Sequence, residues 1–302
     1  MKLAVVGTFF DGYEDLWYDF IGLMKKNWSD CPYDFYIVDN VKELDKEKLN
    51  GMDVKVVHAG EDAEYSKRIQ AALREIDADY FLLLLEDFFI VEKVDNERIK
   101  NITDFIEREK IEYYTMPMPE FMSGKEKERY GDEANVFRIG VNKEYTISCQ
   151  PSIWERKFLS LCVGEENYNA WIFEGIYART QCVRNKEFLA KSVVDYGNPL
   201  NLRHGALQGK MLSPTVKAIE KCGYKLTSRR ELLSKNNELK HRLKEIAHTV
   251  IRKLHLTKIV KKLKKDSVLD KFSEQIAKYS EKTISDEKIA EFVSGRGERV
   301  CR

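Results

Sequence analysis

Two adjacent carboxylates, Glu86 and Asp87, follow the apolar run Tyr80–Leu85 and precede a second apolar run. Acids beside buried aliphatic side chains are costly unless something compensates their charge. A divalent cation, which prefers oxygen ligands, or another ligand at the end of a sheet strand provides such compensation. Neighbouring residues of an extended strand point to opposite faces, so we expect Asp87 to bind directly and Glu86 to bind through water or to orient another group. The alternative is a strand or helix end whose acids reach water.

The segment that carries these acids belongs to an alternation of predicted strands and helices over roughly the first 120 residues. Strands are predicted at 3–7, 35–39, 54–58, 80–85 and 113–117, and helices at 16–28, 64–76 and 96–109. This alternation is typical of βαβ units and predicts an α/β, Rossmann-like fold with a mostly parallel central sheet flanked by helices.

Ligands of such sheets collect beyond the carboxyl ends of the strands. The polar residues that follow predicted strands at this edge are Asp11, Asp39, His58, Glu86 and Asp87. The sequence contains neither G-x-G-x-x-G nor G-x-x-x-x-G-K-[ST], which disfavours dehydrogenases and P-loop nucleotide hydrolases.

The charges of the chain are segregated. Residues 1–224 carry 30 basic and 39 acidic side chains, whereas residues 225–265 carry 14 and 3. We therefore predict one large domain at 1–224 and a basic helical extension at 225–302 that serves membrane association or oligomerisation. A mildly acidic body opposes nucleic-acid binding, and a basic appendage favours an anionic surface.

The stretch 231–265 has the pattern of amphipathic helices with cations around one apolar stripe. The stripe comprises Leu239, Leu243, Ile246, Ala247, Val250, Ile251, Leu254, Ile259, Val260 and Leu263. Such a stretch can lie in the interface of an anionic membrane. The alternatives are a helix packed on the body with a solvated basic face, or a self-associating hairpin that would make a homo-oligomer.

The six cysteines are scattered without a C-x-x-C pair, which favours reduced thiols in a cytoplasmic protein. The N-terminal apolar run is too short for a secretion signal, and no stretch has the length of a membrane span. We therefore expect a cytoplasmic protein that is peripheral on the inner face of the cell membrane.

Four parts of residues 1–210 occur in a specific order. They are the helix from Asp15-Leu16-Trp17 to the stop at Trp28–Tyr33, the turn Tyr65–Arg68, the acidic strand end Leu82–Phe89, and the pair Ser148–Trp154 and Trp171–Glu174. In this order they resemble the GT-A-type glycosyltransferases of bacterial surface-polysaccharide clusters, which build capsule, O-antigen or lipooligosaccharide. The basic stretch lies outside the resemblance.

The resemblance implies a GT-A-like fold and the transfer of a sugar from a nucleotide-sugar, most simply a UDP-sugar, to a lipid-linked or oligosaccharide acceptor. Such transfer needs positive charge at the departing diphosphate and a base for the acceptor hydroxyl. GT-A enzymes often bind Mn²⁺ or Mg²⁺ through an Asp-x-Asp strand end. Here the predicted metal ligands are the adjacent Asp87 and Glu86, so metal dependence stays open.

Catalytic roles are predicted for Asp87 and Glu174. An aromatic segment around Glu174 can raise its pKa by desolvation, which suits a general base and an inverting reaction. Retention of configuration is the alternative. Glu174 could equally cap a helix or form a salt bridge, and Glu165 or Glu166 would then be the base.

The residues predicted to bind the nucleotide-sugar are Thr8, Asp11, Asp39, Lys67, Arg68, Glu86, His204 and Lys210. A guanidinium such as that of Arg68 suits diphosphate oxygens. The alternatives are a solvated helix face for Lys67 and Arg68, turn formation for Asp11 and Asp39, and a structural histidine at 204. Acceptor contacts are predicted for Gln150, Trp154 and Trp171, with a core position as the alternative for Trp154.

Two other functions compete with this prediction. A sugar-nucleotide nucleotidyltransferase shares a similar sheet, but it needs a glycine-rich basic loop after the first strand, and the sequence has none there. A non-catalytic membrane-associated scaffold would use the basic stretch as its working part.

Overall fold

The computed structural model describes residues 1–49, 51–119, 128–131, 134–140, 147–179, 185–207, 209–234 and 271–298. Its main sheet has the strand order β3-β2-β1-β4-β8-β6-β9-β7. The strands are β1 (Leu3–Thr8), β2 (Asp34–Asp39), β3 (Lys55–His58), β4 (Tyr80–Leu85), β6 (Tyr113–Thr115), β7 (Val136–Arg138), β8 (Ser152–Glu155) and β9 (Ser192–Asp195).

Strands β1 to β4 run parallel, as do β6 and β9, whereas β8 and β7 run antiparallel to their neighbours. The prediction of a mixed α/β fold with a mostly parallel central sheet flanked by helices is confirmed.

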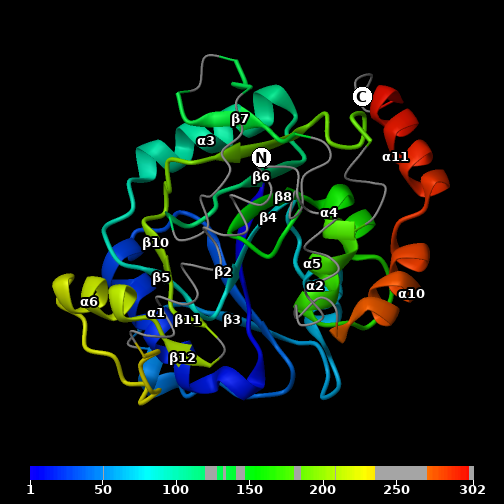
Figure 1. The fold of residues 1–302 in the computed structure, drawn as a ribbon. Coiled ribbons are helices and arrows are strands. Elements are labelled where there is room, and N and C mark those ends of the chain that lie inside the picture. The colour runs from blue at the N-terminus through cyan, green and yellow to red at the C-terminus, as the bar shows by residue number, and fades with distance from the viewer. Residues whose placement is uncertain are drawn as a thin grey trace.

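Helices cover both faces of this sheet (Figure 1). On one face the apolar core includes residues of α1 (Glu14–Trp28), α3 (Asn96–Glu109) and α6 (Ser213–Lys221). On the other face it includes residues of α2 (Tyr65–Glu75), α4 (Arg156–Val163), α5 (Ala170–Arg179), α10 (Ser273–Thr283) and α11 (Asp286–Glu298). Strand alternation divides the side chains between these cores, so that Leu82 and Leu84 face the first and Phe81 and Leu83 the second.

The acidic pair lies where the chain passes from the main sheet into a smaller one. Strand β4 ends at Leu85, Glu86 and Asp87 form a turn, and β5 (Phe88–Ile90) follows. Strand β5 pairs antiparallel with β10 (Leu202–His204). The hairpin β11 (Ala206–Leu207) and β12 (Lys210–Met211) comes next, and two short 3-10 helices, η1 (Asp11–Tyr13) and η2 (Lys46–Leu49), follow β1 and β2.

The described parts of the predicted extension, 225–302, pack on the body. Asp19 of α1 accepts hydrogen bonds from the backbone amides of Thr227 and Ser228 at 2.7 and 2.9 Å. At the far end Ile276 and Ile289 are buried, and the Phe292 ring lies 5.7 Å from that of Phe158.

Helices α10 and α11 are therefore part of the same core as α4 and α5. The amphipathic stripe predicted between residues 239 and 263 lies outside the described residues. Within the described ranges, no helix combines the length and apolar character needed to cross a membrane.

Candidate active site

Asp87 and His204 meet at the carboxyl end of β4. The Oδ2 atom of Asp87 lies 3.1 Å from Nε2 of His204, and the two side chains are only 18% and 14% exposed. Pairing of β10 with β5 sets His204 opposite Phe88, one residue after Asp87. The structure thus brings together two residues that were predicted separately, one as a catalytic and metal-binding acid and one as a nucleotide-sugar contact.

The backbone around this pair is held tightly. The amide of Gly205 donates to the carbonyl of Asp87 at 2.6 Å, and the Thr215 hydroxyl donates to the carbonyl of His204 at 2.6 Å. A Cβ atom on Gly205 would lie 2.3 Å from the Phe89 ring and 2.9 Å from the Asp87 carbonyl oxygen. Only glycine fits this close approach of β10 to the turn after β4.

Glu174 comes to the same region from α5. Its Oε1 atom accepts a hydrogen bond from the Cys149 amide at 2.9 Å. Burial raises the pKa of Glu174, whereas this hydrogen bond and the charge of His204 act in the opposite direction. A carboxyl group whose pKa is raised by burial suits general-base chemistry near neutral pH.

Glu86 points to a different environment from Asp87. Its side chain is buried, near the charges of Arg68 and Asp87 and the backbone of Phe10. Burial, followed by repulsion from Asp87, raises the pKa of Glu86 to about 8. This environment suits a protonated group beneath the loop after β1, and of the two roles predicted for Glu86 it favours orienting another group over binding a metal through water.

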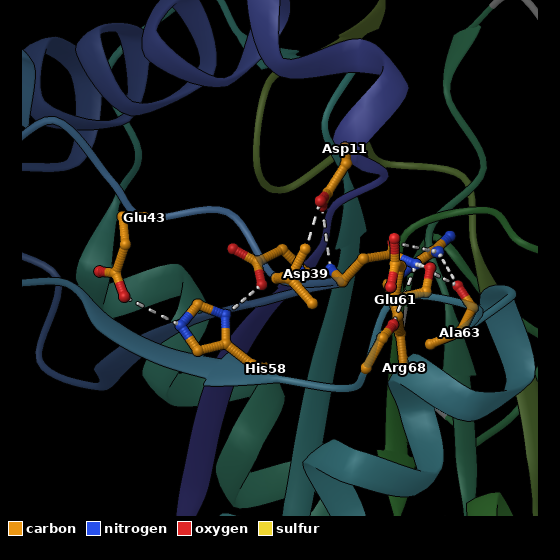
Figure 2. A network of polar contacts seen from close by, with 10 residues as sticks. Asp11, Asp39, Glu43, His58, Glu61, Ala63 and Arg68 are labelled. Carbon is orange, nitrogen blue, oxygen red and sulfur yellow. Dashed lines mark hydrogen bonds and ion pairs between the residues drawn. The ribbon is translucent and has the colours of Figure 1, made fainter.

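A polar network joins the loops that follow β1, β2 and β3 (Figure 2). Asp11 accepts hydrogen bonds from the amides of Asn40 at 2.9 Å and Val41 at 3.3 Å. The Asn40 side-chain amide donates to the carbonyls of Gly60, Glu61 and Ala63, at 3.2, 2.9 and 2.8 Å.

Arg68 completes this network from α2. Its NH1 atom donates to Oδ1 of Asn40 at 3.2 Å and to the carbonyl of Ala63 at 2.8 Å. The guanidinium is buried and lies under the exposed Phe10 ring, 5.6 Å from its centre. Arg68 and Asp11 therefore shape the edge of the sheet by fixing its loops.

Asp39 and His58 form a second pair at this edge. Oδ1 of Asp39 lies 2.7 Å from Nδ1 of His58, and the other carboxylate oxygen is buried without a hydrogen-bond partner. Burial raises the pKa of Asp39 to about 6, and the hydrogen bond to Asp39 raises the pKa of His58. His58 remains partly exposed, with Glu43 at 3.7 Å from its Nε2 atom.

Three of the side chains predicted to bind the nucleotide-sugar instead form contacts within the protein. The Thr8 side chain is buried and donates to the Leu84 carbonyl at 3.4 Å. Lys67 donates to the Glu165 carbonyl at 2.9 Å, and Lys210 pairs with Glu231 at 2.7 Å. Each of the three side chains is thus engaged within the protein.

The three residues predicted to contact the acceptor differ in how accessible they are. Trp154 is 1% exposed and packs against Tyr113 and Phe158, so its ring faces are covered by protein, which corrects the prediction of sugar stacking. The Gln150 side chain accepts a hydrogen bond from the Met118 amide at 3.2 Å. Trp171 is 46% exposed and precedes Glu174 by about one helical turn, which leaves its ring available to a ligand.

The alternative base Glu166 is held by a lysine of α10. Glu166 pairs with Lys282 of α10 at 2.8 Å, and this contact lowers its pKa, the opposite of what a general base at neutral pH needs.

The described residues contain no group of three His, Cys, Asp or Glu side chains that could hold a metal ion. Mg²⁺-like ions are, however, commonly bound by one or two side chains together with substrate phosphates and water. Adjacent ligands of an octahedral ion are about 3 Å apart, so the 3.1 Å between Asp87 and His204 fits two such ligands as well as a hydrogen bond.

Sequence reasoning missed the roles of Asn40 and Cys149. Asn40 follows the strand-end acid Asp39, so the signal that singled out Asp39 applied to its neighbour as well. The backbone amide of Cys149 holds Glu174, and no side-chain pattern reveals such a contact.

No protein-family model matches the sequence, and a comparison with curated proteins gives no match. Among solved structures, TarS of S. aureus is similar, with a TM-score of 0.43 and 15% identity over 65% of this chain and 35% of that chain. TarS 1–349 in complex with UDP-GlcNAc has a TM-score of 0.38 and 16% identity, over 59% of this chain and 53% of that one.

A cytidylyltransferase from Leptospira borgpetersenii is similar at a TM-score of 0.38 and 11% identity, over 63% of this chain and 74% of that one. The chain spans about a third of the length of the longer TarS structure. At these identities and TM-scores the likeness is confined to the general α/β arrangement.

Proposed function

We propose that the protein is a glycosyltransferase that moves a sugar from a nucleotide-sugar, most simply a UDP-sugar, to a glycan or lipid-linked acceptor. The observation that carries the proposal is the contact of Asp87 with His204 at the carboxyl edge of the sheet, with Glu174 near enough for the charge of His204 to act on its pKa. The acid–histidine pair would provide a charge partner for a diphosphate, and the half-buried Glu174 would provide a base.

The base acts on the acceptor. Glu174, with its raised pKa, takes the proton of the acceptor hydroxyl as that oxygen attacks the anomeric carbon. Attack from the side opposite the departing diphosphate inverts the configuration. Trp171, one turn earlier on α5, provides an aromatic face for an acceptor sugar ring.

The departing diphosphate needs positive charge. A protonated His204, held by Asp87, supplies it directly by donating to a phosphate oxygen. Alternatively Asp87 and His204 would hold Mn²⁺ or Mg²⁺, which would supply electrostatic stabilisation of the diphosphate. Asp39 and His58, at the ends of β2 and β3, lie where the nucleoside would extend along the same edge.

We further propose that the acceptor belongs to bacterial surface-polysaccharide assembly, such as capsule or lipopolysaccharide. The protein would then work in the cytoplasm, peripherally on the inner face of the cell membrane. This rests on the family resemblance of the motifs in residues 1–210 and on the basic composition of residues 225–265.

A panel of nucleotide-sugars tests the proposal, with release of the nucleoside diphosphate as the readout. We expect one donor to be turned over, with and without added acceptors, and Glu174→Gln to lower kcat about 10²- to 10⁴-fold while donor binding persists. Glu166→Gln is the matched control, because this glutamate is only partly buried and pairs with Lys282. Absence of turnover and of nucleotide binding with every donor would reject the proposal.

A further inference from the structure

The segment that follows α6, residues 224–233, runs past α1 to the hairpin β11–β12, and we call it the strap (Figure 1). Asp19 of α1 anchors its first half. The fully buried carboxylate of Asp19 accepts the Thr227 amide at 2.7 Å, the Thr227 hydroxyl at 2.9 Å and the Ser228 amide at 2.9 Å. The strap is therefore fixed to the helix that follows the loop after β1.

The second half of the strap is fixed to the hairpin β11–β12. The Met211 amide donates to the Glu231 carbonyl at 2.9 Å, and the Leu233 amide donates to the Met211 carbonyl at 2.8 Å. The hairpin starts directly after Gly205, whose amide donates to the Asp87 carbonyl at 2.6 Å. The strap thus connects α1 with the backbone that surrounds the acidic turn after β4.

Arg230 lies between these two anchors and clamps the N-terminal end of α1. Its Nε and NH2 atoms donate to Oδ2 and Oδ1 of Asp15, both at 2.6 Å. The same guanidinium lies over the Tyr13 ring, 4.1 Å from its centre. A planar guanidinium can donate to both carboxylate oxygens and stack on an aromatic ring, whereas the ammonium group of a lysine cannot replace this paired geometry.

Tyr13 connects the clamp to the loop after β1. Its ring lies 6.0 Å from that of Phe10 in an edge-on arrangement, and its amide donates to the Phe10 carbonyl at 2.8 Å. The buried guanidinium of Arg68 lies 5.6 Å from the centre of the Phe10 ring, and the Phe10 backbone is near Glu86 of the acidic turn. A continuous series of ring and guanidinium contacts therefore runs from Arg230 to Arg68.

We propose that Arg230 is a positioning residue of the donor site, a role that rests on the proposed function. Phe10 is 43% exposed, so burial alone does not fix its ring. By holding Tyr13 on α1, Arg230 keeps the loop after β1 in the conformation in which Phe10 covers Arg68 beside the acidic turn. Without the clamp the loop populates other conformations, and the apparent affinity for a nucleoside diphosphate falls in proportion to the fraction of molecules with the loop in place.

Calorimetric titration with UDP and Mn²⁺ tests this role, and two variants separate positioning from charge. Arg230→Ala removes a positive charge and Asp15→Ala removes a negative one. A purely electrostatic effect on the diphosphate would therefore weaken binding in the first variant and strengthen it in the second. Loss of the clamp weakens binding in both, and we expect the Kd to rise about tenfold in each.

Arg229→Ala is the matched control for these two variants. Arg229 is exposed and carries the same charge as Arg230 one position earlier in the strap. Its removal changes the net charge as Arg230→Ala does but leaves the clamp intact. We expect the Kd for UDP to stay within about twofold of the native value, because exposed charges are screened by salt.

Steady-state kinetics with the donor that the nucleotide-sugar panel identifies give a second readout. We expect Arg230→Ala to raise the KM for the donor about tenfold and to leave kcat within about twofold, because only donor binding depends on the loop. A general loss of folded protein would instead lower kcat and leave KM unchanged. Arg230→Lys, which keeps the charge but not the paired donors, is the milder variant should Arg230→Ala lower the melting temperature.

Hydrogen exchange tests the clamp without any substrate. The backbone amides of residues 9–14 should exchange faster in Arg230→Ala and in Asp15→Ala than in the native protein, because the loop opens more often. Exchange of the same amides in Arg229→Ala should match that of the native protein.

Three results would overturn the inference. They are unchanged exchange of residues 9–14 in both clamp variants, faster exchange with unchanged UDP affinity and donor KM, and shifts of the Kd in opposite directions in the two variants. A native protein that binds no nucleoside diphosphate would reject the proposed function and the donor role of Arg230 together. Native binding that the clamp variants leave unaffected would reject the positioning role alone.

Discussion

The carboxylate of Asp87 and the imidazole of His204 lie 3.1 Å apart, although one belongs to the turn after β4 and the other to the last position of β10. The β5–β10 pairing creates this contact, and the hydrogen bond from Gly205 to the Asp87 carbonyl fixes it. The pair places an anionic and a cationic or metal-binding group side by side at the edge of a parallel sheet, where ligands of such folds collect.

The His204→Gln variant tests the chemical role of the imidazole. Glutamine keeps a nitrogen donor toward Asp87 but cannot carry a positive charge. If His204 stabilises the leaving diphosphate, kcat for sugar transfer should fall about 10²- to 10³-fold with little change in melting temperature. Lys210→Ala is the control, because Lys210 pairs with Glu231 and should be dispensable. Equal losses in both variants would argue against a specific role for His204.

The buried Glu86 makes a prediction about stability and pH. Its pKa is about 8 in the folded protein against 4.5 for an ordinary glutamate. The folded protein therefore binds more protons than the unfolded chain between these values, and the free energy of unfolding falls as the pH rises from about 4.5 to about 8.

Glu86→Gln should remove this dependence, because glutamine resembles the protonated acid. The free energy of unfolding of the variant, relative to the native protein, should rise by roughly 3 to 5 kcal/mol between pH 5 and pH 9. Urea unfolding at a series of pH values measures the difference. Parallel pH profiles for the two proteins would show that Glu86 is ionised in the fold.

Asp39 and His58 allow a direct test of their hydrogen bond. The bond to Asp39 raises the pKa of His58, so Asp39→Asn should bring the pKa of His58 back toward that of an ordinary histidine. An NMR titration of the histidine ring protons measures it, with His58→Gln to assign the signal among the five histidines. An unchanged titration in Asp39→Asn would mean that the pair does not form in solution.

The C-terminal helices should be required for the stability of the body. Ile276 of α10 is 2% exposed in the core shared with α4 and α5, so Ile276→Ala should cost about 2 to 4 kcal/mol of unfolding free energy. Leu232→Ala, at an exposed position, is the comparison and should change stability by less than about 0.5 kcal/mol. Similar small changes in both variants, measured by urea unfolding, would indicate that α10 detaches readily.

Strands β1 to β4 and β6 of the main sheet could be predicted from the sequence because they are short, mostly apolar runs in a chain that also shows helical periodicity, whereas β7, β8 and β9 were not predicted. The acidic end of β4 was evident because two carboxylates directly follow the apolar run Tyr80–Leu85. The partnership of Asp87 with His204 could not be predicted, because it depends on the pairing of β5 with β10, two short strands far apart in the chain. Neither strand has a local pattern that specifies its partner.

Side-chain burial was the other point that the sequence left open. Trp154 and Ile153 alternate on β8, and both are buried because helices cover both faces of the sheet. An aromatic residue on such a strand therefore joins the core whichever face it occupies. Arg68 and Glu86 are buried together by the loops around Phe10, which no periodicity in the sequence indicates.

Calorimetric titration of the native protein with UDP in the presence of Mn²⁺ tests the central claim, that the turn after β4 binds the diphosphate of a nucleotide-sugar. We predict saturable binding that Asp87→Ala abolishes and Lys67→Ala retains, since Lys67 is engaged with the Glu165 carbonyl. Binding that survives Asp87→Ala unchanged, or no binding of any nucleoside diphosphate by the native protein, would contradict the account.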